Sequence, residues 1–205
     1  MLFDFSVLSA RDRYKLLVNL VVPRPIAWVT TLSADGKANA APFSFFNCFG
    51  DDPPTLAIGV RGKQPGALND TGENIRATGE FVVNLVAEDC LERMNVTAVE
   101  FPHDVDELEQ AGLTTQPSRF IKPPRIAESP AAFECERLIS VDLGPTQSVI
   151  FGRVLAAHIR DDVVIDPARC YVDTVRMDLV GRAYGTSHYA RMGDIIHMPR
   201  LPNPG

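Results

Sequence analysis

Residues 23–47, PRPIAWVTTLSADGKANAAPFSFFN, carry the clearest indication of secondary structure in the chain. Ile26–Leu32 is rich in β-branched and aromatic residues, which favour a strand. Asp35-Gly36 is a residue pair typical of a tight hairpin turn. Ala38–Asn47 then returns as a second extended segment. The stretch therefore predicts an antiparallel hairpin.

Short strands and inserted helices are expected around this hairpin. Ser9–Asp12 fits a capping box, so a first helix should follow it and end before Pro23. A second short helix is expected from Asp70 to Thr78. Further expected elements are strands at Thr55–Val60, Phe81–Val86, Phe133–Leu143, Val149–Ala157 and Val163–Ile165, a helix at Glu88–Val99 and a loop-rich segment from Glu100 to Ser129. Because helices and strands do not alternate regularly, the pattern favours an antiparallel barrel, mainly β with inserted helices, over a doubly wound parallel sheet.

The composition is that of a globular chain, with 205 residues, 45% of them hydrophobic and 22% charged. This length predicts a single domain over residues 1–205. The net charge of -6 disfavours nucleic acid as a partner. The most apolar stretch, Leu16–Leu32, is interrupted by prolines and an arginine, so no membrane span is expected. The acidic N-terminus is unlike a signal peptide, and the protein is predicted to be cytoplasmic.

Several common catalytic and metal-binding motifs have no match in the sequence. GxGxxG, GxxxxGK[ST], GxSxG and HExxH are all missing, so the corresponding classes of enzyme lack local support. Cys48, Cys90, Cys135 and Cys170 are far apart and form no CxxC pair, and no metal site is predicted. Ordinary reduced thiols are expected, with the role of Cys48 left open because it adjoins the phenylalanine-rich segment.

The first positive indication is the mixture of aromatic and polar residues at the end of the hairpin. Asn39, Ser44 and Asn47 are interspersed with Phe43 and Phe45. A flat heteroaromatic ligand needs apolar contacts for its faces and a few polar groups at its edge. The alternative is that these phenylalanines belong to the core and the polar groups cap turns.

The second indication is the helix expected to start at Asp70–Thr71. Unpaired backbone N–H groups and the positive dipole end of a helix can bind an anion, and the Thr71 hydroxyl with Arg61 or Lys63 would complete a phosphate site. The Asp70 carboxylate would repel a phosphate, so a plain helix cap is the alternative.

Together these segments resemble the flavin reductase-like FMN-binding split-barrel family, which includes flavoredoxins and the reductase components of two-component monooxygenases. The resemblance rests on Pro23–Thr31, on Asn39–Asn47 followed by Pro53-Pro54, on Asp70–Asn84, on Gly152–Val154 with His158, and on Val180–Arg182 with Tyr189–Arg191. It implies a split β-barrel of the antiparallel Greek-key type. It also implies non-covalent FMN, with FAD as the alternative, in a cleft completed by the second subunit of a homodimer.

The resemblance also implies roles for individual residues. In the family pattern Thr71 contacts the phosphate and backbone N–H groups between Ala41 and Ser44 face the N5 and O4 edge of the flavin. His158 and Tyr189 are candidates for the nicotinamide side, and no catalytic side chain is implied. The implied cofactor-binding residues are Thr30, Thr31, Asn39, Ala41, Pro42, Ser44, Phe45, Asn47, Arg61, Lys63 and Thr71.

Two positions depart from the family pattern. Some flavoredoxin-like members carry Lys-Phe shortly before the glycine and leucine equivalent to Gly112-Leu113, where this chain has Glu107-Leu108. A histidine often found before the glycine equivalent to Gly152 is here Gln147. Both departures bear on flavin binding and leave the fold unchanged.

The resemblance predicts an NAD(P)H-dependent flavin reductase in which the nicotinamide passes hydride to FMN, with a monooxygenase or an electron-transfer protein as a further partner. Three alternatives remain. One is a flavoredoxin-type electron-transfer protein that takes electrons from a protein donor. The second is a flavin-binding protein for storage or sensing, and the third is a barrel that has lost its ligand. The choice between NADH and NADPH stays open.

Overall fold

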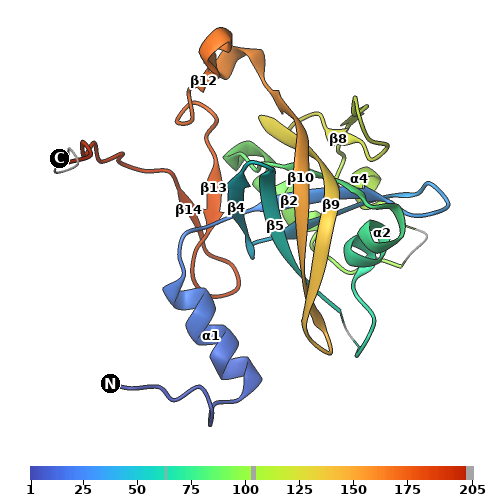
Figure 1. Cartoon of the computed structure of the whole chain (residues 1–205), viewed down its shortest axis with the longest axis vertical. Helices are drawn as coiled ribbons and strands as arrows, with labels where there is room; N and C mark the ends of the chain where they lie inside the picture. Colours follow the sequence, from blue (N-terminus) through green and yellow to red (C-terminus); the bar gives the residue numbers. More distant parts are fainter. Residues whose placement is uncertain (63, 103–104, 202–205) are drawn as a thin grey trace.

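The computed structural model describes residues 1–62, 64–102 and 105–201. Its main body is a seven-stranded antiparallel sheet in the order β3-β2-β6-β9-β10-β5-β4 (Figure 1). The strands are β2 (Ala27–Leu32), β3 (Ala38–Phe43), β4 (Phe46–Asp51), β5 (Pro54–Arg61), β6 (Glu80–Asn84), β9 (Ala131–Gly144) and β10 (Gln147–Ile159). In the described part of the chain no ladder joins the edge strands β3 and β4, so the barrel is split there.

Helices and small sheets surround the barrel. The helices are α1 (Ala10–Leu20), α2 (Asp70–Thr78), α3 (Leu91–Val96) and α4 (Glu107–Gln110), with short 3-10 turns η1 (Glu88–Cys90), η2 (Asp161–Val163) and η3 (Pro167–Arg169). The small sheets pair β1 (Arg24–Pro25) with β13 (Val180–Arg182) and β14 (Tyr189–Arg191), β7 (Thr115–Gln116) with β8 (Arg125–Ile126), and β11 (Val164–Asp166) with β12 (Tyr171–Val172). Helix α1 and the C-terminal arm extend away from the barrel (Figure 1). No helix in the described ranges is both long and apolar enough to cross a bilayer.

The predicted hairpin is confirmed, with Thr31 of β2 opposite Asn39 of β3. The single extended segment expected at Ala38–Asn47 is wrong, because the chain turns at Ser44-Phe45 and continues as a separate strand, β4. This turn carries the chain to the other edge of the sheet, where β4 pairs with β5 and the Phe45 carbonyl accepts the Gly59 N–H at 2.7 Å.

Both predicted helix starts occur, with one change of cap. Ser9 caps α1 as predicted, since its Oγ accepts the Asp12 N–H at 3.2 Å. The cap of α2 is Asn69 rather than Asp70, because the Asn69 side chain accepts the Gly72 N–H at 3.1 Å. Asp70 is therefore the first residue inside α2. The loop-rich segment expected at 100–129 also contains the short α4, β7 and β8.

The two faces of β2 contribute to two separate buried clusters. Val29 packs inside the barrel with Phe81 and Ile58. Trp28 faces the other way, is fully buried, and donates from Nε1 to the Thr97 Oγ1 at 2.9 Å. Trp28 is the only tryptophan in the chain, so its fluorescence reports on unfolding.

Gly152→Ala tests how tightly the barrel interior is packed. A Cβ at residue 152 would lie 2.3 Å from Cζ of the fully buried Phe81, so the substitution should lower the free energy of unfolding by about 1–3 kcal/mol. Denaturant unfolding followed by Trp28 fluorescence measures this loss. Gly193→Ala is the control, because nothing lies within 4 Å of a Cβ there. Equal unfolding midpoints for the two variants would contradict the expected overpacking.

Candidate functional site

Polar side chains from three elements meet at the N-terminus of α2. Asn39 of β3 donates from Nδ2 to the Thr71 Oγ1 at 2.9 Å, and Asn74 of α2 donates to the Thr31 Oγ1 at 3.0 Å. Thr71 is only 1% exposed, so its hydroxyl is held in one place. No described residue accepts the Thr71 hydroxyl proton. The cluster can therefore donate a hydrogen bond at the N-terminus of α2, next to the backbone N–H groups of its first residues.

A cavity of about 870 Å³ opens beside this cluster. Its wall is made by β3, by the connection from β5 to α2, and by the segment after α3. The N-terminus of α2 gives one part of the wall a positive dipole end, which favours an anion. The charged residues among its described lining are Arg61, Asp70, Glu73, Glu100 and Glu107. The cavity thus combines anion-binding groups with several carboxylates.

A second cavity of about 450 Å³ adjoins the first, because the two share Pro42, Phe43 and Arg61 in their walls. Its wall is largely apolar and includes five aromatic side chains, and the ring centroids of two of them, Tyr14 and Phe45, are 6.2 Å apart. We refer to the two adjoining cavities together as the extended site, which has a polar, anion-binding end and an apolar end. Such a site suits a long ligand that has a flat ring at one end and an anionic group at the other.

Most of the predicted cofactor-binding residues lie in the walls of these two cavities. The larger cavity takes in Asn39, Ala41, Pro42, Arg61 and Thr71, and the smaller takes in Pro42, Ser44, Phe45, Asn47 and Arg61. Thr31 lies behind the wall, bonded to Asn74. The prediction for Lys63 falls outside the described residues. The structure thus brings together β3, the turn into β4 and the start of α2.

Thr30 lies apart from the two cavities. Its side chain is fully buried and donates from Oγ1 to the Pro124 carbonyl at 2.5 Å. It also accepts a hydrogen bond from the Asn84 Nδ2 at 3.2 Å. These contacts lie on the opposite face of β2 from Thr31, since successive side chains of a strand alternate between faces. Thr30 therefore fixes the loop before β8 against the barrel.

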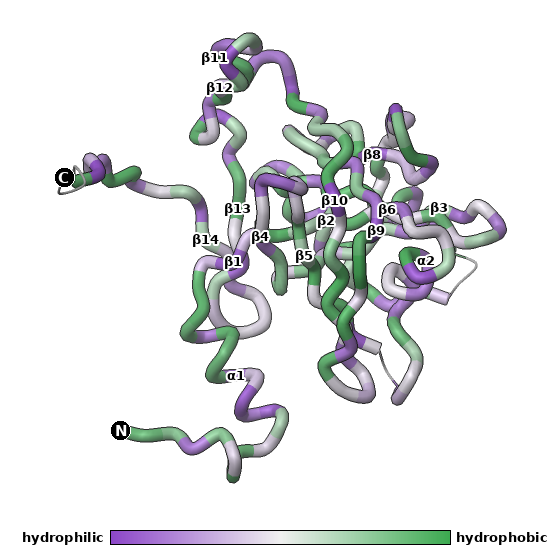
Figure 2. Tube along the Cα trace, in the orientation of Figure 1, coloured by the Kyte–Doolittle hydropathy of each residue, from purple (hydrophilic) through white to green (hydrophobic). Residues whose placement is uncertain are grey.

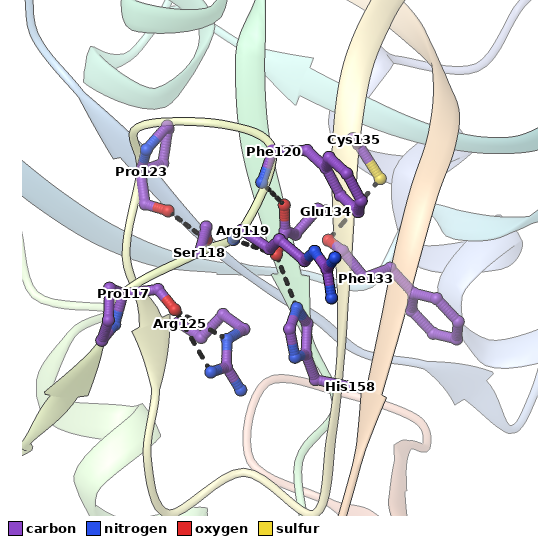
Figure 3. Close-up of polar contacts among 10 residues, drawn as sticks. All are labelled: Pro117, Ser118, Arg119, Phe120, Pro123, Arg125, Phe133, Glu134, Cys135 and His158. Carbon is purple, nitrogen blue, oxygen red and sulfur yellow. Dashed lines mark hydrogen bonds and ion pairs between the residues drawn. The ribbon is translucent and has the colours of Figure 1, made fainter.

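His158 contacts a buried carboxylate instead of either cavity. Its Nε2 lies 2.5 Å from the Glu134 Oε1 (Figure 3). Glu134 is fully buried and also accepts the backbone N–H groups of Arg119 and Phe120, each at 2.7 Å. Burial opposes the ionisation of Glu134, but the two N–H groups and His158 outweigh it and lower the pKa of the carboxyl. The group therefore holds the loop of residues 117–124 as an ionised carboxylate.

Tyr189 is also outside the walls of the two cavities. It lies in β14, opposite Arg182 of β13, and the Arg182 guanidinium carbon is 4.6 Å from the centre of its ring. The remainder of the ring packs against the cluster that contains Trp28. Within one chain, the structure does not bring the two nicotinamide-side candidates to the site.

Cys48 is exposed on β4 and is not in the wall of either cavity. Burial raises the pKa of Cys90 to about 12, which leaves that thiol unreactive. In the described part of the chain no three metal-binding side chains lie together.

Asn69 and the segment from Thr97 to Phe101 were not among the predicted site residues, yet both line the larger cavity. Asn69 is signalled in the sequence as a favoured capping residue directly before Asp70. The 97–101 segment has no such signal, because it reaches the cavity only through the packing of α3 against β3.

Comparison with known proteins identifies the family. The model of the flavin reductase like domain matches residues 19–176. An uncharacterized protein of Deinococcus radiodurans is 40% identical over 203 residues, covering 97% of this chain and 89% of that protein. The structure of 2-nitrobenzoate 2-nitroreductase NbaA from Pseudomonas fluorescens matches all of both chains with 35% identity and a TM-score of 0.89. Nitrilotriacetate monooxygenase component B from Bacillus cereus matches with 28% identity and a TM-score of 0.91, covering 97% of this chain and 98% of its own. The chain therefore belongs to the flavin reductase-like domain family.

Proposed function

We propose that this chain is an FMN-binding oxidoreductase that passes hydride from NAD(P)H to the flavin. The observation that carries the proposal is the extended site, with Thr71 and the start of α2 at one end and aromatic side chains at the other. Family membership supports flavin chemistry. The likeness to NbaA, which is named a nitroreductase, supports a reductive role.

The residues of the site fit FMN in kind and in order. The Thr71 hydroxyl and the first N–H groups of α2 would hold the phosphate, with Arg61 adding positive charge. Asn39 and Ala41, which lie between the two ends, would contact the ribityl chain. Ser44 and Phe45 would meet the ring, one at its polar edge and the other at its apolar face. FAD is the alternative occupant.

A bound flavin would accept hydride from a nicotinamide and pass the electrons onward. The chain contributes binding, orientation and the exclusion of water. Strand β3 is an edge strand, and its outward-facing Pro42 has no N–H, so the backbone N–H of Ser44, just beyond the strand, would donate to the polar edge of the ring. Aromatic side chains such as Phe43 and Phe45 would keep water from the ring. Hydride transfer of this kind needs no acid or base from the protein, and no catalytic side chain is proposed.

The test is the visible absorbance spectrum of the purified, concentrated protein, followed by identification by mass of any chromophore released on denaturation. We expect a flavin spectrum, release of FMN, and flavin-dependent oxidation of NADH or NADPH. A colourless protein that also fails to bind added FMN or FAD would refute the proposal. Flavin binding without any oxidation of NADH or NADPH would refute the donor alone and favour the electron-transfer alternative.

The same proposal includes a homodimer, supported by the apolar surface of the single chain. Exposed apolar side chains lie on α1, on the β9–β10 hairpin and on the C-terminal arm, and the hydropathy colouring of these segments is visible in Figure 2. Examples are Leu17, Leu20, Ile139, Leu143 and Ile196. Exposed apolar surface of this extent is usual at subunit interfaces. Light scattering coupled to size exclusion should give twice the chain mass, and a monomer mass would contradict the dimer.

We propose that the protein works in the cytoplasm. A monooxygenase would receive the electrons or the reduced flavin, and an electron-transfer protein is the alternative acceptor. Exposed, unpaired Cys48 and Cys170 suit a reducing compartment. The likeness to a protein named as a monooxygenase component supports the acceptor. Flavin-dependent stimulation of a purified oxygenase by this protein would be the positive result.

Thr71→Val should weaken FMN binding by about tenfold or more, because a hydrogen bond to a charged group contributes about 1.5–3 kcal/mol. Thr71→Ser keeps the hydroxyl and is the matched control. Quenching of flavin fluorescence during titration measures both dissociation constants. If Thr71→Val and Thr71→Ser bound FMN equally well, the hydroxyl would have no role at the phosphate.

A further inference from the structure

Glu107 places a carboxylate in the wall of the larger cavity. Its side chain is only 9% exposed and shares that wall with Thr71 and Asn39. Glu107 also lines a smaller cavity of about 250 Å³, together with Asn39, Asp70 and Glu73. It therefore lies next to the start of α2, at the same end of the site as the anion-binding groups.

The surrounding structure fixes Glu107 in this position. The preceding residue, Asp106, caps α4 by accepting the Leu108 N–H at 2.8 Å. Leu108 is 3% exposed and packs in the cluster that contains Trp28, so α4 is anchored against β3. The packing of Leu108 thus holds the backbone of Glu107 beside β3.

The charges near Glu107 are mostly negative. Asp70 and Glu73 face it from α2, Asp106 from its own helix, and Asn39 and the Ala40 N–H from β3. Asp35 and Lys37 also line the smaller cavity, and Arg61 and Glu100 also line the larger one. Burial raises the pKa of Glu107 above its ordinary value, and the charges of Asp70 and Asp106 raise it further. Hydrogen bonds from the backbone N–H groups of Glu107 and Ala40 lower the pKa, but they do not cancel the rise. Protonation of this carboxyl group is thus accessible closer to neutral pH than for an exposed glutamate.

We propose that Glu107 sets the preference of the site between phosphorylated and unphosphorylated flavin, an inference that rests on the proposed flavin binding. Ionised Glu107 repels a phosphate at the start of α2, whereas protonated Glu107 can donate a hydrogen bond to it. Riboflavin ends in an uncharged hydroxyl and is indifferent to this charge. FMN binding therefore takes up a proton at Glu107, and the preference for FMN over riboflavin falls as the pH rises.

The test compares the dissociation constants of FMN and riboflavin for the native chain, Glu107→Gln and Glu109→Gln. Glu109 is exposed on the same helix and serves as the matched control. At about pH 8, where a phosphate monoester is a dianion, Glu107→Gln should bind FMN about tenfold more tightly and leave riboflavin unchanged. Glu109→Gln should change neither constant. Calorimetry of FMN binding in two buffers of different ionisation enthalpy should show proton uptake by the native chain and a smaller uptake by Glu107→Gln.

Each outcome separates this inference from the proposed function. If both flavins bind and the FMN to riboflavin ratio is the same in the native chain and Glu107→Gln, Glu107 does not set the preference, and the flavin site stands. If neither flavin binds to any of the three proteins, the proposed function fails and this inference with it. Should Glu107→Gln not fold, the native chain still decides: binding of FMN without proton uptake overturns the inference.

Discussion

Glu134→Gln is expected to lower the free energy of unfolding by about 3 kcal/mol, the cost of leaving a buried donor without an acceptor and disrupting a buried hydrogen-bond network. The Glu134 carboxylate accepts two backbone N–H groups, from Arg119 and Phe120, and contacts His158 (Figure 3). Glutamine has one carbonyl oxygen, so its amide N–H would face one of these donors. The loop of residues 117–124 should then loosen from the barrel. Denaturant unfolding followed by Trp28 fluorescence measures the loss.

Glu136→Gln is the matched control for this prediction. Glu136 lies two residues further along β9 and pairs with Arg153 at 2.6 Å, but both side chains are about half exposed. An exposed pair of this kind contributes at most about 1 kcal/mol. Similar losses in the Glu134 and Glu136 variants would show that the buried network does not hold the loop.

The difference between the native chain and Glu134→Gln should depend on pH. The folded pKa of Glu134 lies below its ordinary value of 4.5. A carboxyl group with a lowered pKa stabilises the fold fully above its unfolded pKa, and this stability is lost as the pH falls through the folded value. The destabilisation should therefore shrink as the pH falls through the folded pKa of Glu134. A difference that stays the same down to the acid transition would show that the charge of Glu134 is not what stabilises the fold.

The sequence predicted those parts of the fold and the site that depend on local interactions. The hairpin turn at Asp35-Gly36 and the cap at Ser9 follow from residues a few positions apart, and both are present. The residues from Asn39 to Asn47 line the site because one short segment carries both the polar and the aromatic groups. Residues that are close in the sequence stay close in space, so these features did not depend on how the rest of the chain folds.

The parts that could not be predicted depend on which strands become neighbours. Thr30 and Thr31 are adjacent in the sequence, but they face opposite sides of β2, and only the covering elements decide which side meets the cavity. His158 reads as a free polar group until β9 lies beside β10 and brings Glu134 to it. Glu107 was singled out as an acid where a cation was expected, yet its burial beside the start of α2 follows from the packing of α4 on β3.

Gly62→Ala is expected to weaken FMN binding by about tenfold or more, because a displaced wall would cost hydrogen bonds to the charged phosphate, each contributing about 1.5–3 kcal/mol. Gly62 is buried directly after β5, and its N–H donates to the Thr146 carbonyl at 2.9 Å. A Cβ at residue 62 would lie 1.5 Å from the Ala67 carbonyl oxygen and 2.6 Å from its carbon. Both are backbone atoms, so no side-chain rotation can relieve the clash. The backbone at Gly62 or Ala67 must move, and both residues line the larger cavity.

The control for Gly62→Ala has to show whether any change of side chain in this connection weakens FMN binding. Gln64→Ala does so, because Gln64 is exposed, lines the same cavity and belongs to the same connection between β5 and α2. It should bind FMN within about threefold of the native chain, since an exposed polar contact contributes little. Titration of FMN against both variants, with Trp28 fluorescence confirming that each is folded, gives the comparison. If folded Gly62→Ala bound FMN as tightly as the native chain, the connection would tolerate the displacement. The anion-binding end of the site would then depend on α2 and β3 alone.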